Sequence, residues 1–324
     1  MPVRIVSTGS QLPELVVTNG DMAKIVDTSD EWIRTRTGIA ERRVAVRETT
    51  SSLGAAAARK ALEAASLSPA DIGLVLCATC TPDYCVPPVS CKIRELLGVG
   101  DAVTLDINVE CTGFVYALSI ASSMMETQNL RYALVIGAEV VNGIVDWTNR
   151  ATCVLFGDGA GAVVLERGKE SASRILDVHL GGVNDADGAL RCALPRQATP
   201  FGPALEAEPP FVYMNGRSVF AFAVRAFLDS SRTVMERNRI TAEEIRWFVP
   251  HQANLRIIAS AAERMAVPIE KFYTDIDHLG NTGAATIPIA LDEMNAAGLL
   301  SRGDLLLLVA FGGGLTYGSA LVRW

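Results

Sequence analysis

The chain has 324 residues, of which 49 % are hydrophobic, 20 % are charged and only 6 % are aromatic. This composition is typical of a soluble α/β enzyme whose core consists largely of Ala, Val, Leu and Ile, and the length favours one large domain or two tightly joined domains. The 29 basic and 36 acidic side chains give a net charge of −7, which argues against a nucleic-acid-binding surface but allows a small local basic patch.

Targeting signals are not evident in this sequence. Residues 1–13 contain no long apolar run followed by a cleavage site, and no segment approaches 18 uninterrupted apolar residues. We therefore expect a cytoplasmic protein with no membrane partner. Seven cysteines, an odd number, indicate reduced thiols rather than a disulfide framework.

Four of the cysteines crowd one region, where Cys77 and Cys80 form a C-x-x-C pattern and Cys85 and Cys91 follow. A zinc or redox site is one interpretation of this pattern. However, no second C-x-x-C or histidine pair lies nearby to complete a tetrahedral site, and Cys77 ends the apolar run IGLVLC, which is typical of a central strand. We predict packing roles for these thiols and no metal.

The same pattern of elements occurs twice along the chain. Residues 51–65 and 219–238 predict helices, and each helix precedes a Ser or Thr, acidic residues, an Ile and an apolar strand, in 67–79 and in 240–252. Two helices with an x-T-G opening begin at Cys111 and Asn281, which lie 170 residues apart. The strands RYALVIGAEV and DLLLLVAFGG then repeat at an offset of 175 residues, between Gly137 and Gly312.

Chance similarity between two α/β segments is the alternative, but the nearly constant offset favours a duplicated unit. Strands that alternate with helices predict mainly parallel sheets covered on both faces. We therefore expect a layered α/β structure with pseudo-twofold symmetry, made of an N-terminal half, residues 1–170, and a C-terminal half, residues 171–324. The aperiodic, Gly- and Pro-rich residues 181–210 are expected to cover a substrate entrance or a subunit contact.

Cys111 lies between the predicted strand LDINVE and a predicted helix that begins FVYALSIASSMM, with Thr112 and Gly113 allowing a sharp turn. The N–H groups and dipole at a helix N-terminus would lower the pKa of its thiol and make it a nucleophile. A small apolar residue packed where two elements meet is the other interpretation. The residues alone leave both open.

Only three histidines are present. His179 lies in an alternating strand and is expected to be structural, whereas His278 lies in a polar loop where it could be solvated or functional. His251 follows the apolar run RWFVP, at the carboxyl end of a predicted strand, where α/β proteins place their sites. It is the strongest candidate of the three.

Asn281 and two glycine-rich segments complete the candidates. Asn281 lies between Gly280 and Thr282, a context that also suits a turn or cap residue. Residues 311–321, FGGGLTYGSAL, could bring a backbone N–H close to a ligand, although such runs also form ordinary turns. Residues 156–165, FGDGAGAVVL, do not open a helix as a dinucleotide fingerprint does, and we predict a tight turn between strands there.

Together these motifs resemble the β-ketoacyl-acyl carrier protein synthase III family of the thiolase superfamily. The resemblance rests on C-T-G-F at Cys111, H-Q-A-N at His251, G-N-T at 280–282, and the glycine motifs at Phe156 and Phe311. It extends to TSDEWIRTRTGIAERR from residue 28 and to the C-terminal SALVRW, so it covers nearly the whole chain. Any one motif would be weak, but all of them occur in order and at family-like spacing.

The resemblance implies a thiolase-like αβαβα fold and a decarboxylating condensation that initiates fatty acid synthesis. Cys111 would attack an acyl-CoA, with the backbone N–H groups of Cys111 and Gly313 as the oxyanion hole. His251 and Asn281 would hold the thioester oxygen of malonyl-acyl carrier protein while CO2 leaves. The carbanion would then attack the acylated Cys111. No metal or redox cofactor is implied.

Further roles follow from the same resemblance. The residues implied to contact CoA are Thr28, Trp32, Arg36, Arg150 and Asn254, with Trp32 and an arginine enclosing the adenine. Val86 and Phe311 would line the acyl pocket, and Arg256 would face the acidic carrier protein. The family also implies a homodimer. The helix around Trp32 could otherwise be an ordinary capped helix with a half-buried tryptophan.

Two positions depart from the family pattern. Glu110 precedes the nucleophile where many members have a small apolar residue, and its carboxylate would raise the thiol pKa unless it points away. Val86 replaces a bulky aromatic residue of acetyl-selective members, so we expect a roomier acyl pocket. A related condensing enzyme of a secondary-metabolite pathway remains the alternative function. A degradative thiolase would need a second catalytic cysteine in the C-terminal glycine segment, which has none, and an inactive partner subunit would lack Cys111, His251 or Asn281, all of which are present.

Overall fold

The computed structural model describes residues 2–168, 172–194, 200–202 and 208–324. Two large sheets dominate it, and two short two-stranded sheets lie beside them. In spatial order, the first large sheet contains β1 Val3–Gln11, β7 Gly159–Arg167, β6 Tyr132–Glu139, β4 Ile72–Ala78 and β5 Val103–Ile107. The second contains β11 Trp247–Pro250, β12 Leu305–Gly312, β13 Thr316–Arg323 and β8 Arg174–Gly182. The short sheets pair β2 Leu15–Thr18 with β3 Glu41–Val44, and β9 Leu190–Cys192 with β10 Val212–Met214.

The helices of the described residues connect and cover these sheets. They are α1 Asn19–Met22, α2 Asp30–Thr37, α3 Thr50–Ala65, α4 Val89–Leu97, α5 Gly113–Thr127, α6 Gly216–Asn238, α7 Leu255–Met265, α8 Ile276–Leu279 and α9 Thr286–Ala296. No helix in this described part of the chain is both long and apolar enough to cross a bilayer.

The two sheets repeat one topology, which confirms the predicted duplication. In the first sheet β4 pairs in parallel with β6, and β7 and β1 then follow antiparallel. In the second sheet β11, β12, β13 and β8 repeat this sequence of pairings. A parallel bridge from Phe248 to Phe272 lies where β5 pairs with β4 in the first sheet.

The expectation of mainly parallel sheets is wrong, because both sheets are mixed. A parallel neighbour requires a crossover connection, usually a helix. β12 reaches β13 through the short turn Gly313–Leu315, so the two strands must run antiparallel. The corresponding strand β7 follows β6 without an α-helix between them.

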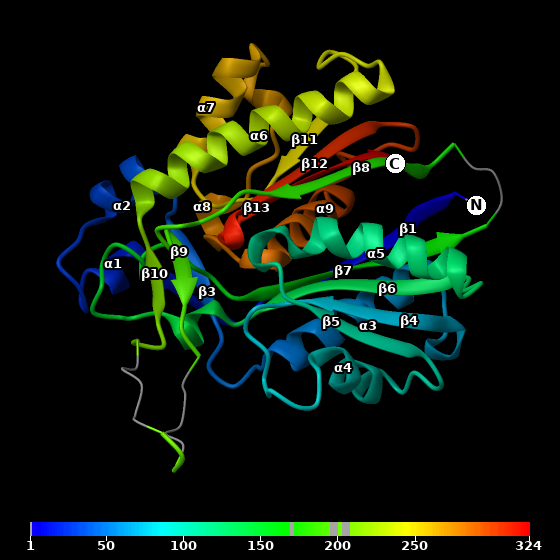
Figure 1. Ribbon diagram of the computed structural model, residues 1–324, viewed down its shortest axis with the longest axis horizontal. Helices are drawn as coiled ribbons and strands as arrows, with labels where there is room; N and C mark the ends of the chain where they lie inside the picture. Colours follow the sequence, from blue (N-terminus) through cyan, green and yellow to red (C-terminus); the bar gives the residue numbers. More distant parts are fainter. Residues whose placement is uncertain (1, 169–171, 195–199, 203–207) are drawn as a thin grey trace.

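The elements stack in five layers (Figure 1). Helices α6 and α7 cover the outer face of the second sheet, α5 and α9 lie between the two sheets, and α3 and α4 cover the outer face of the first sheet. This is the αβαβα arrangement expected from the resemblance. The short strands β9 and β10 and the helices α1 and α2 gather at one end of the stack, and the chain termini lie at the other.

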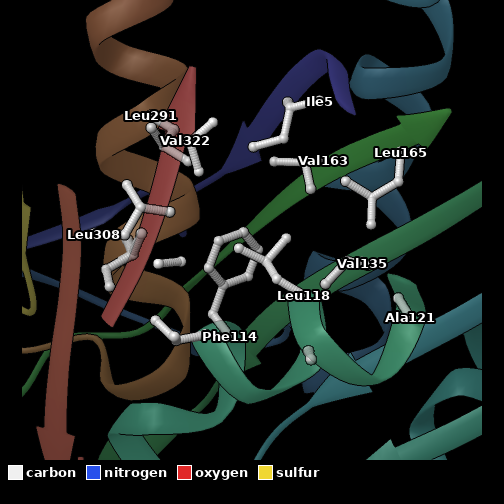
Figure 2. Close-up of a cluster of buried hydrophobic side chains, with 14 of the residues drawn as sticks. Ile5, Phe114, Leu118, Ala121, Val135, Val163, Leu165, Leu291, Leu308 and Val322 are labelled. Atoms are coloured by element: carbon white, nitrogen blue, oxygen red, sulfur yellow. The ribbon is translucent and has the colours of Figure 1, made fainter. Parts of the chain in front are cut away.

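The largest apolar core fills the layer between the sheets (Figure 2). Phe114, Leu118 and Ala121 of α5 pack against side chains of both sheets, including Val135 and Leu308. The buried positions of α5 repeat at the three- and four-residue spacing of one helix face, which Val115 widens. Each fully buried Phe or Leu contributes about 1.5–3 kcal/mol to this packing.

Close packing in the middle layer explains part of the glycine pattern. Residues 159–167 form strand β7, so the predicted tight turn over 156–165 is wrong. A side chain at Gly161 would place its Cβ 2.5 Å from the backbone nitrogen of Ile289 and 2.6 Å from the carbonyl carbon of Pro288 in α9. These glycines therefore admit the backbone of α9 rather than a nucleotide.

Two sequence predictions fall partly outside the described residues. The predicted boundary between the halves, at residues 170 and 171, is one of them, and the first and second sheets lie on either side of it. Within 181–210, residues 195–199 and 203–207 also lie outside the described part.

Candidate active site

A cavity of about 780 Å3 opens where the carboxyl ends of the parallel strands converge. Its wall includes residues that follow β4, β5, β6 and β11, together with the end of β12. Cys111, His251 and Asn281 all lie on this wall. The structure thus brings together three candidates that are up to 170 residues apart in the sequence.

Cys111 occupies the predicted junction of strand and helix. Strand β5 ends at Ile107, a 3₁₀ turn covers Glu110–Thr112, and α5 begins at Gly113. The backbone of Gly312 packs directly against the cysteine, because a Cβ at that glycine would lie 3.0 Å from Cys111 Cβ. The thiol therefore faces the cavity from the start of a helix instead of packing in the core.

The expectation that this position lowers the thiol pKa is wrong for the free chain. Cys111 is partly exposed to the cavity, yet the surrounding protein desolvates it and raises its pKa well above the usual value. The negative charges of Glu110 and Glu139 raise it further. At neutral pH the group is a thiol, so attack on a thioester requires the loss of a proton.

His251 follows β11 directly and is buried, with an exposed fraction of 1 %. Burial lowers the pKa of its imidazole to about 3, so the ring is neutral at physiological pH. The Nδ1 atom lies 3.2 Å from the Thr286 hydroxyl, and the ring contacts Phe311 edge-on with centroids 5.4 Å apart. A neutral imidazole held in this way can donate one hydrogen bond to a ligand.

Asn281 is held by its backbone and by its side chain. Its N–H donates to the carbonyl of Leu155 at 2.8 Å, and its own carbonyl accepts from the N–H of Gly157 at 3.0 Å. Its side-chain Oδ1 accepts from the N–H of Gly283 at 2.9 Å. Because Oδ1 is engaged, the Nδ2 amide is the end of the side chain that can donate to a ligand.

Similarity to known proteins covers nearly the whole chain. The family model of the 3-oxoacyl-acyl carrier protein synthase III C terminal matches residues 235–324, and that of 3-oxoacyl-acyl carrier protein synthase III matches residues 105–184. A β-ketoacyl-acyl carrier protein synthase III of Clostridium acetobutylicum is 46 % identical over 322 residues, which cover 99 % of this chain and 98 % of the relative. The chain belongs to the synthase III family.

Solved structures agree with this assignment. A 3-oxoacyl-acyl carrier protein synthase III from Aquifex aeolicus superimposes with a TM-score of 0.93 at 43 % identity, covering 99 % of this chain and 100 % of the other. The priming β-ketosynthase of the R1128 polyketide pathway has a TM-score of 0.90 at 35 % identity, with coverages of 99 % and 96 %.

Several residues implied to contact CoA in synthase III enzymes lie at one part of the cavity. Trp32, Arg36 and Asn254 line its wall. The Arg36 and Arg150 guanidinium carbons lie 4.5 Å and 4.9 Å from the centroid of the Trp32 ring. The two cations therefore flank a tryptophan face, although Arg150 and Thr28 are not on the wall itself.

Of the residues predicted to line the acyl pocket or to face the carrier protein, only Phe311 lies on the cavity wall. Phe311 is buried on the cavity wall, whereas Val86 is 82 % exposed in the loop after β4 and away from the cavity of its own chain. Arg256 is exposed in the first turn of α7, and its guanidinium lies 6.0 Å from the Phe220 ring. The role predicted for Val86 would thus require a second copy of the chain.

The described part of 181–210 supports the substrate-entrance prediction. Leu190 and Leu194 of this segment line the cavity, and β9 within it pairs with β10, which begins just after the segment at Val212, another residue of the cavity wall. His278, in contrast, lies off the cavity wall and pairs with Asp277 at 2.8 Å and Glu293 at 3.3 Å. This histidine therefore forms ion pairs with two acidic side chains and does not contribute to the site.

The C-x-x-C pattern divides into different environments. Cys77 is buried in the core, as expected for a packing residue, but Cys80 lines the cavity and Cys85 is exposed. The packing prediction is therefore wrong for the latter two. Within the described residues, no group of three or more His, Cys, Asp or Glu side chains is arranged to hold a metal.

Glu139 is a functional-site neighbour that the sequence reasoning missed. It is buried at the end of β6, where it accepts hydrogen bonds from the Thr79 and Thr81 hydroxyls and from the Cys80 N–H. Burial raises the pKa of its carboxyl to about 7. The sequence does indicate it, because Glu139 is the one acidic residue at the carboxyl end of the otherwise apolar run that forms β6.

Glu110 does not point away from the nucleophile. Its carboxyl faces the cavity, and Oε2 accepts a hydrogen bond from the Gly313 N–H at 2.9 Å. This is the N–H that the family resemblance implies for the oxyanion hole. In the free chain, that donor is therefore already engaged.

Proposed function

We propose that this protein catalyses the decarboxylating condensation of an acyl-CoA primer with malonyl-acyl carrier protein, which initiates fatty acid synthesis. The observation that supports this most directly is the convergence of a helix-start thiol, a neutral imidazole and an oriented carboxamide on one cavity wall. These are the groups that a Cys-based acyl transfer and a carbanion-forming step need.

In the first half-reaction, the pantetheine arm of the acyl-CoA enters the cavity from the side of Trp32 and the flanking arginines. The Cys111 sulfur attacks the thioester carbonyl, the developing oxyanion is held by backbone N–H groups, and CoA leaves as a thiol. The acyl group then remains on Cys111 while the malonyl group of the carrier protein takes the place of CoA.

In the second half-reaction, His251 and Asn281 donate hydrogen bonds to the thioester oxygen of the malonyl group. Negative charge moves to that oxygen as the C–C bond to the carboxylate breaks and CO2 leaves. The neutral state of His251 suits this role, because it has a proton to donate without bringing a fixed positive charge. The carbanion attacks the acyl carbonyl, and the β-ketoacyl product leaves on the carrier protein.

The chemistry needs no metal or redox cofactor, because the thioester already supplies an activated acyl group. We further propose a cytoplasmic homodimer in which Arg256 contributes to the docking of the acidic carrier protein. Two large apolar side chains of this loop, Tyr84 and Val86, are exposed, and this local apolar surface supports a partner copy at the loop.

The test is intact-protein mass spectrometry in two steps. Incubation with an acyl-CoA should add one acyl mass to the protein, peptide mapping should place it on Cys111, and malonyl-acyl carrier protein should then remove it. Cys111→Ala is the control and should acquire no adduct. An adduct that forms on another residue, or that malonyl-acyl carrier protein does not discharge, contradicts the proposal.

Primer choice follows from Val86. A valine fills less space than an aromatic ring, so medium-chain acyl-CoAs should acylate Cys111 at rates comparable to acetyl-CoA. A strong preference for acetyl-CoA contradicts the roomier pocket.

A priming synthase of a polyketide pathway is the second candidate, since the R1128 priming enzyme shares the fold at 35 % identity. Discharge of acylated Cys111 by a polyketide carrier protein, with none by the fatty acid carrier protein, would favour that candidate.

A further inference from the structure

Glu110 is the one carboxylic acid among the described residues on the cavity wall. It precedes Cys111 in the chain and adopts a left-handed backbone conformation, with φ of 45°. Non-glycine residues in this region are uncommon and are retained mainly where the surrounding structure requires them. Here the conformation directs the carboxyl into the cavity, onto the Gly313 N–H.

The backbone of Gly312 and Gly313 brings this carboxyl and the nucleophile together. A Cβ at Gly312 would lie 3.0 Å from Cys111 Cβ, and a side chain at Gly313 would collide with the carboxyl of Glu110. Cys111 therefore lies against Gly312, and the Glu110 carboxyl lies against the next residue, Gly313. Proton transfer between neighbouring groups of this kind occurs directly or through one water molecule.

The thiol needs a proton acceptor, and the other polar groups of the wall supply none. Burial holds the pKa of His251 at about 3, so its imidazole is a weak base, and the Asn281 amide is no base at neutral pH. Desolvation raises the pKa of Glu110, which makes its carboxylate a better base than an exposed glutamate.

We propose that Glu110 accepts the Cys111 proton as the thiol attacks the acyl-CoA, and that this same protonation frees the Gly313 N–H to hold the thioester oxygen. The inference rests on the proposed function and goes beyond the family resemblance, which implies a small apolar residue at this position in many members. A carboxylate binds an N–H roughly twice as strongly as a neutral acid does, so protonation weakens the contact with Gly313.

The step balances in protons and bonds. The S–H bond of Cys111 breaks, its proton moves to a Glu110 oxygen, and the sulfur forms a bond to the carbonyl carbon. The carbon–sulfur bond to CoA then breaks, and Glu110 returns the proton to the departing CoA sulfur. Glu110 becomes a carboxylate again, while the acyl group stays on Cys111.

The pH dependence of acylation provides the test. The groups that face Glu110 are Cys111, Cys80 after β4, Asp185 before β9 and Cys192 on β9. With Glu110 ionised, the wild-type acylation rate should be nearly flat from about pH 7 to about pH 9. In Glu110→Gln only the thiolate fraction can react, so the rate should fall about 100-fold at neutral pH and rise about tenfold per pH unit.

Rapid quenching and mass spectrometry of the Cys111 adduct from acetyl-CoA and hexanoyl-CoA measure these rates. Asp185→Asn is the matched control, because it removes a neighbouring charge and leaves the Glu110 carboxyl in place. It should keep the flat profile. Replacement of Glu110 should lower the limiting rate of acylation and leave the half-saturating concentration of acyl-CoA unchanged.

A second variant keeps the test decisive if Glu110→Gln does not fold. Glu110→Gly accommodates the left-handed backbone and leaves space for a small carboxylate. Sodium formate, but not sodium chloride, should restore its acylation by at least about tenfold.

Three results separate the possibilities. Wild-type rates and a flat profile in Glu110→Gln and Glu110→Gly overturn the role of Glu110 and leave the proposed function intact. Faster acylation in both variants also overturns it, because the carboxylate would then only obstruct Gly313. The absence of any wild-type adduct on Cys111 overturns the proposed function itself.

Discussion

Replacement of His251 by Gln should make the protein less sensitive to acid. The imidazole has a pKa of about 3 in the folded chain because it is buried, against about 6.5 in the unfolded chain. Below pH 6.5 the unfolded chain gains a proton that the folded chain does not take up. The free energy of unfolding therefore falls as the pH falls, and a glutamine at this position removes that contribution.

The size of this contribution follows from the two pKa values. Between about pH 7 and about pH 5, this single group costs the wild type about 2 kcal/mol of stability that His251→Gln does not lose. Other acids, such as Glu139, titrate in both proteins, so their contributions cancel in the comparison. The substitution also removes the contact with Thr286, but that loss is the same at both pH values.

The assay is urea unfolding followed by tryptophan fluorescence, for both proteins at both pH values. His278→Gln is the matched control with the opposite sign. Hydrogen bonds, with the larger effect from Glu293 and a smaller one from Asp277, raise the pKa of His278 to about 9. The protonated ring therefore adds to the free energy of unfolding below pH 6.5, and this stabilisation disappears as the pH rises through 9. If the stability of the wild type and of His251→Gln changes in parallel with pH, the His251 imidazole is not held neutral by burial. Its proposed role as a hydrogen-bond donor would then be refuted.

Three further predictions concern catalysis and binding. Asn281→Asp should reduce CO2 release from malonyl-acyl carrier protein by about 100-fold to 1000-fold, because a carboxylate replaces the Nδ2 donor beside the developing negative charge. Thr286→Val should slow the same step by about fivefold, because it removes the hydroxyl that contacts Nδ1 of His251 at 3.2 Å and fixes the orientation of the ring. Trp32→Ala should weaken CoA binding about tenfold in calorimetric titrations, since it removes the surface on which Arg36 and Arg150 stack.

Each of these predictions has a control and a contrary result. Acylation of Cys111 should persist in the Asp variant of Asn281, and CO2 release within tenfold of wild type would contradict its role. Thr286→Ser retains the hydroxyl and should restore the rate lost in Thr286→Val. Trp247→Ala removes a tryptophan that also contacts an arginine but lies off the cavity, so an equal loss of CoA affinity there would contradict the predicted adenine site.

The sequence predicted the duplicated architecture because hydrophobic periodicity is a local property. The repeated helices, strands and x-T-G openings could be aligned without knowing where any strand lies in space. Strand direction was harder to predict. Whether β7 and β13 run parallel or antiparallel depends on how their connections return to the sheet, and neither residues 140–158 nor the short turn Gly313–Leu315 gave a clear signal.

Candidate residues could be identified by type and position, but their protonation states could not. The sequence placed Cys111 at a helix start and His251 at a strand end, which holds in the structure. It also suggested a lowered thiol pKa. Desolvation and the charges of Glu110 and Glu139 reverse that expectation, since both depend on which atoms surround the sulfur.

Taken by itself, the sequence determined the elements, their repetition and the chemical groups available, because spacing and residue type are read directly along the chain. Only the tertiary structure decided which of these groups meet. It brings the Glu110 carboxyl to the Gly313 N–H, 203 residues away, and the Thr286 hydroxyl to His251. The first contact depends on the packing of the two halves against each other, and the second on the packing of α9 against β11 within the C-terminal half, so no local pattern in the sequence encodes either.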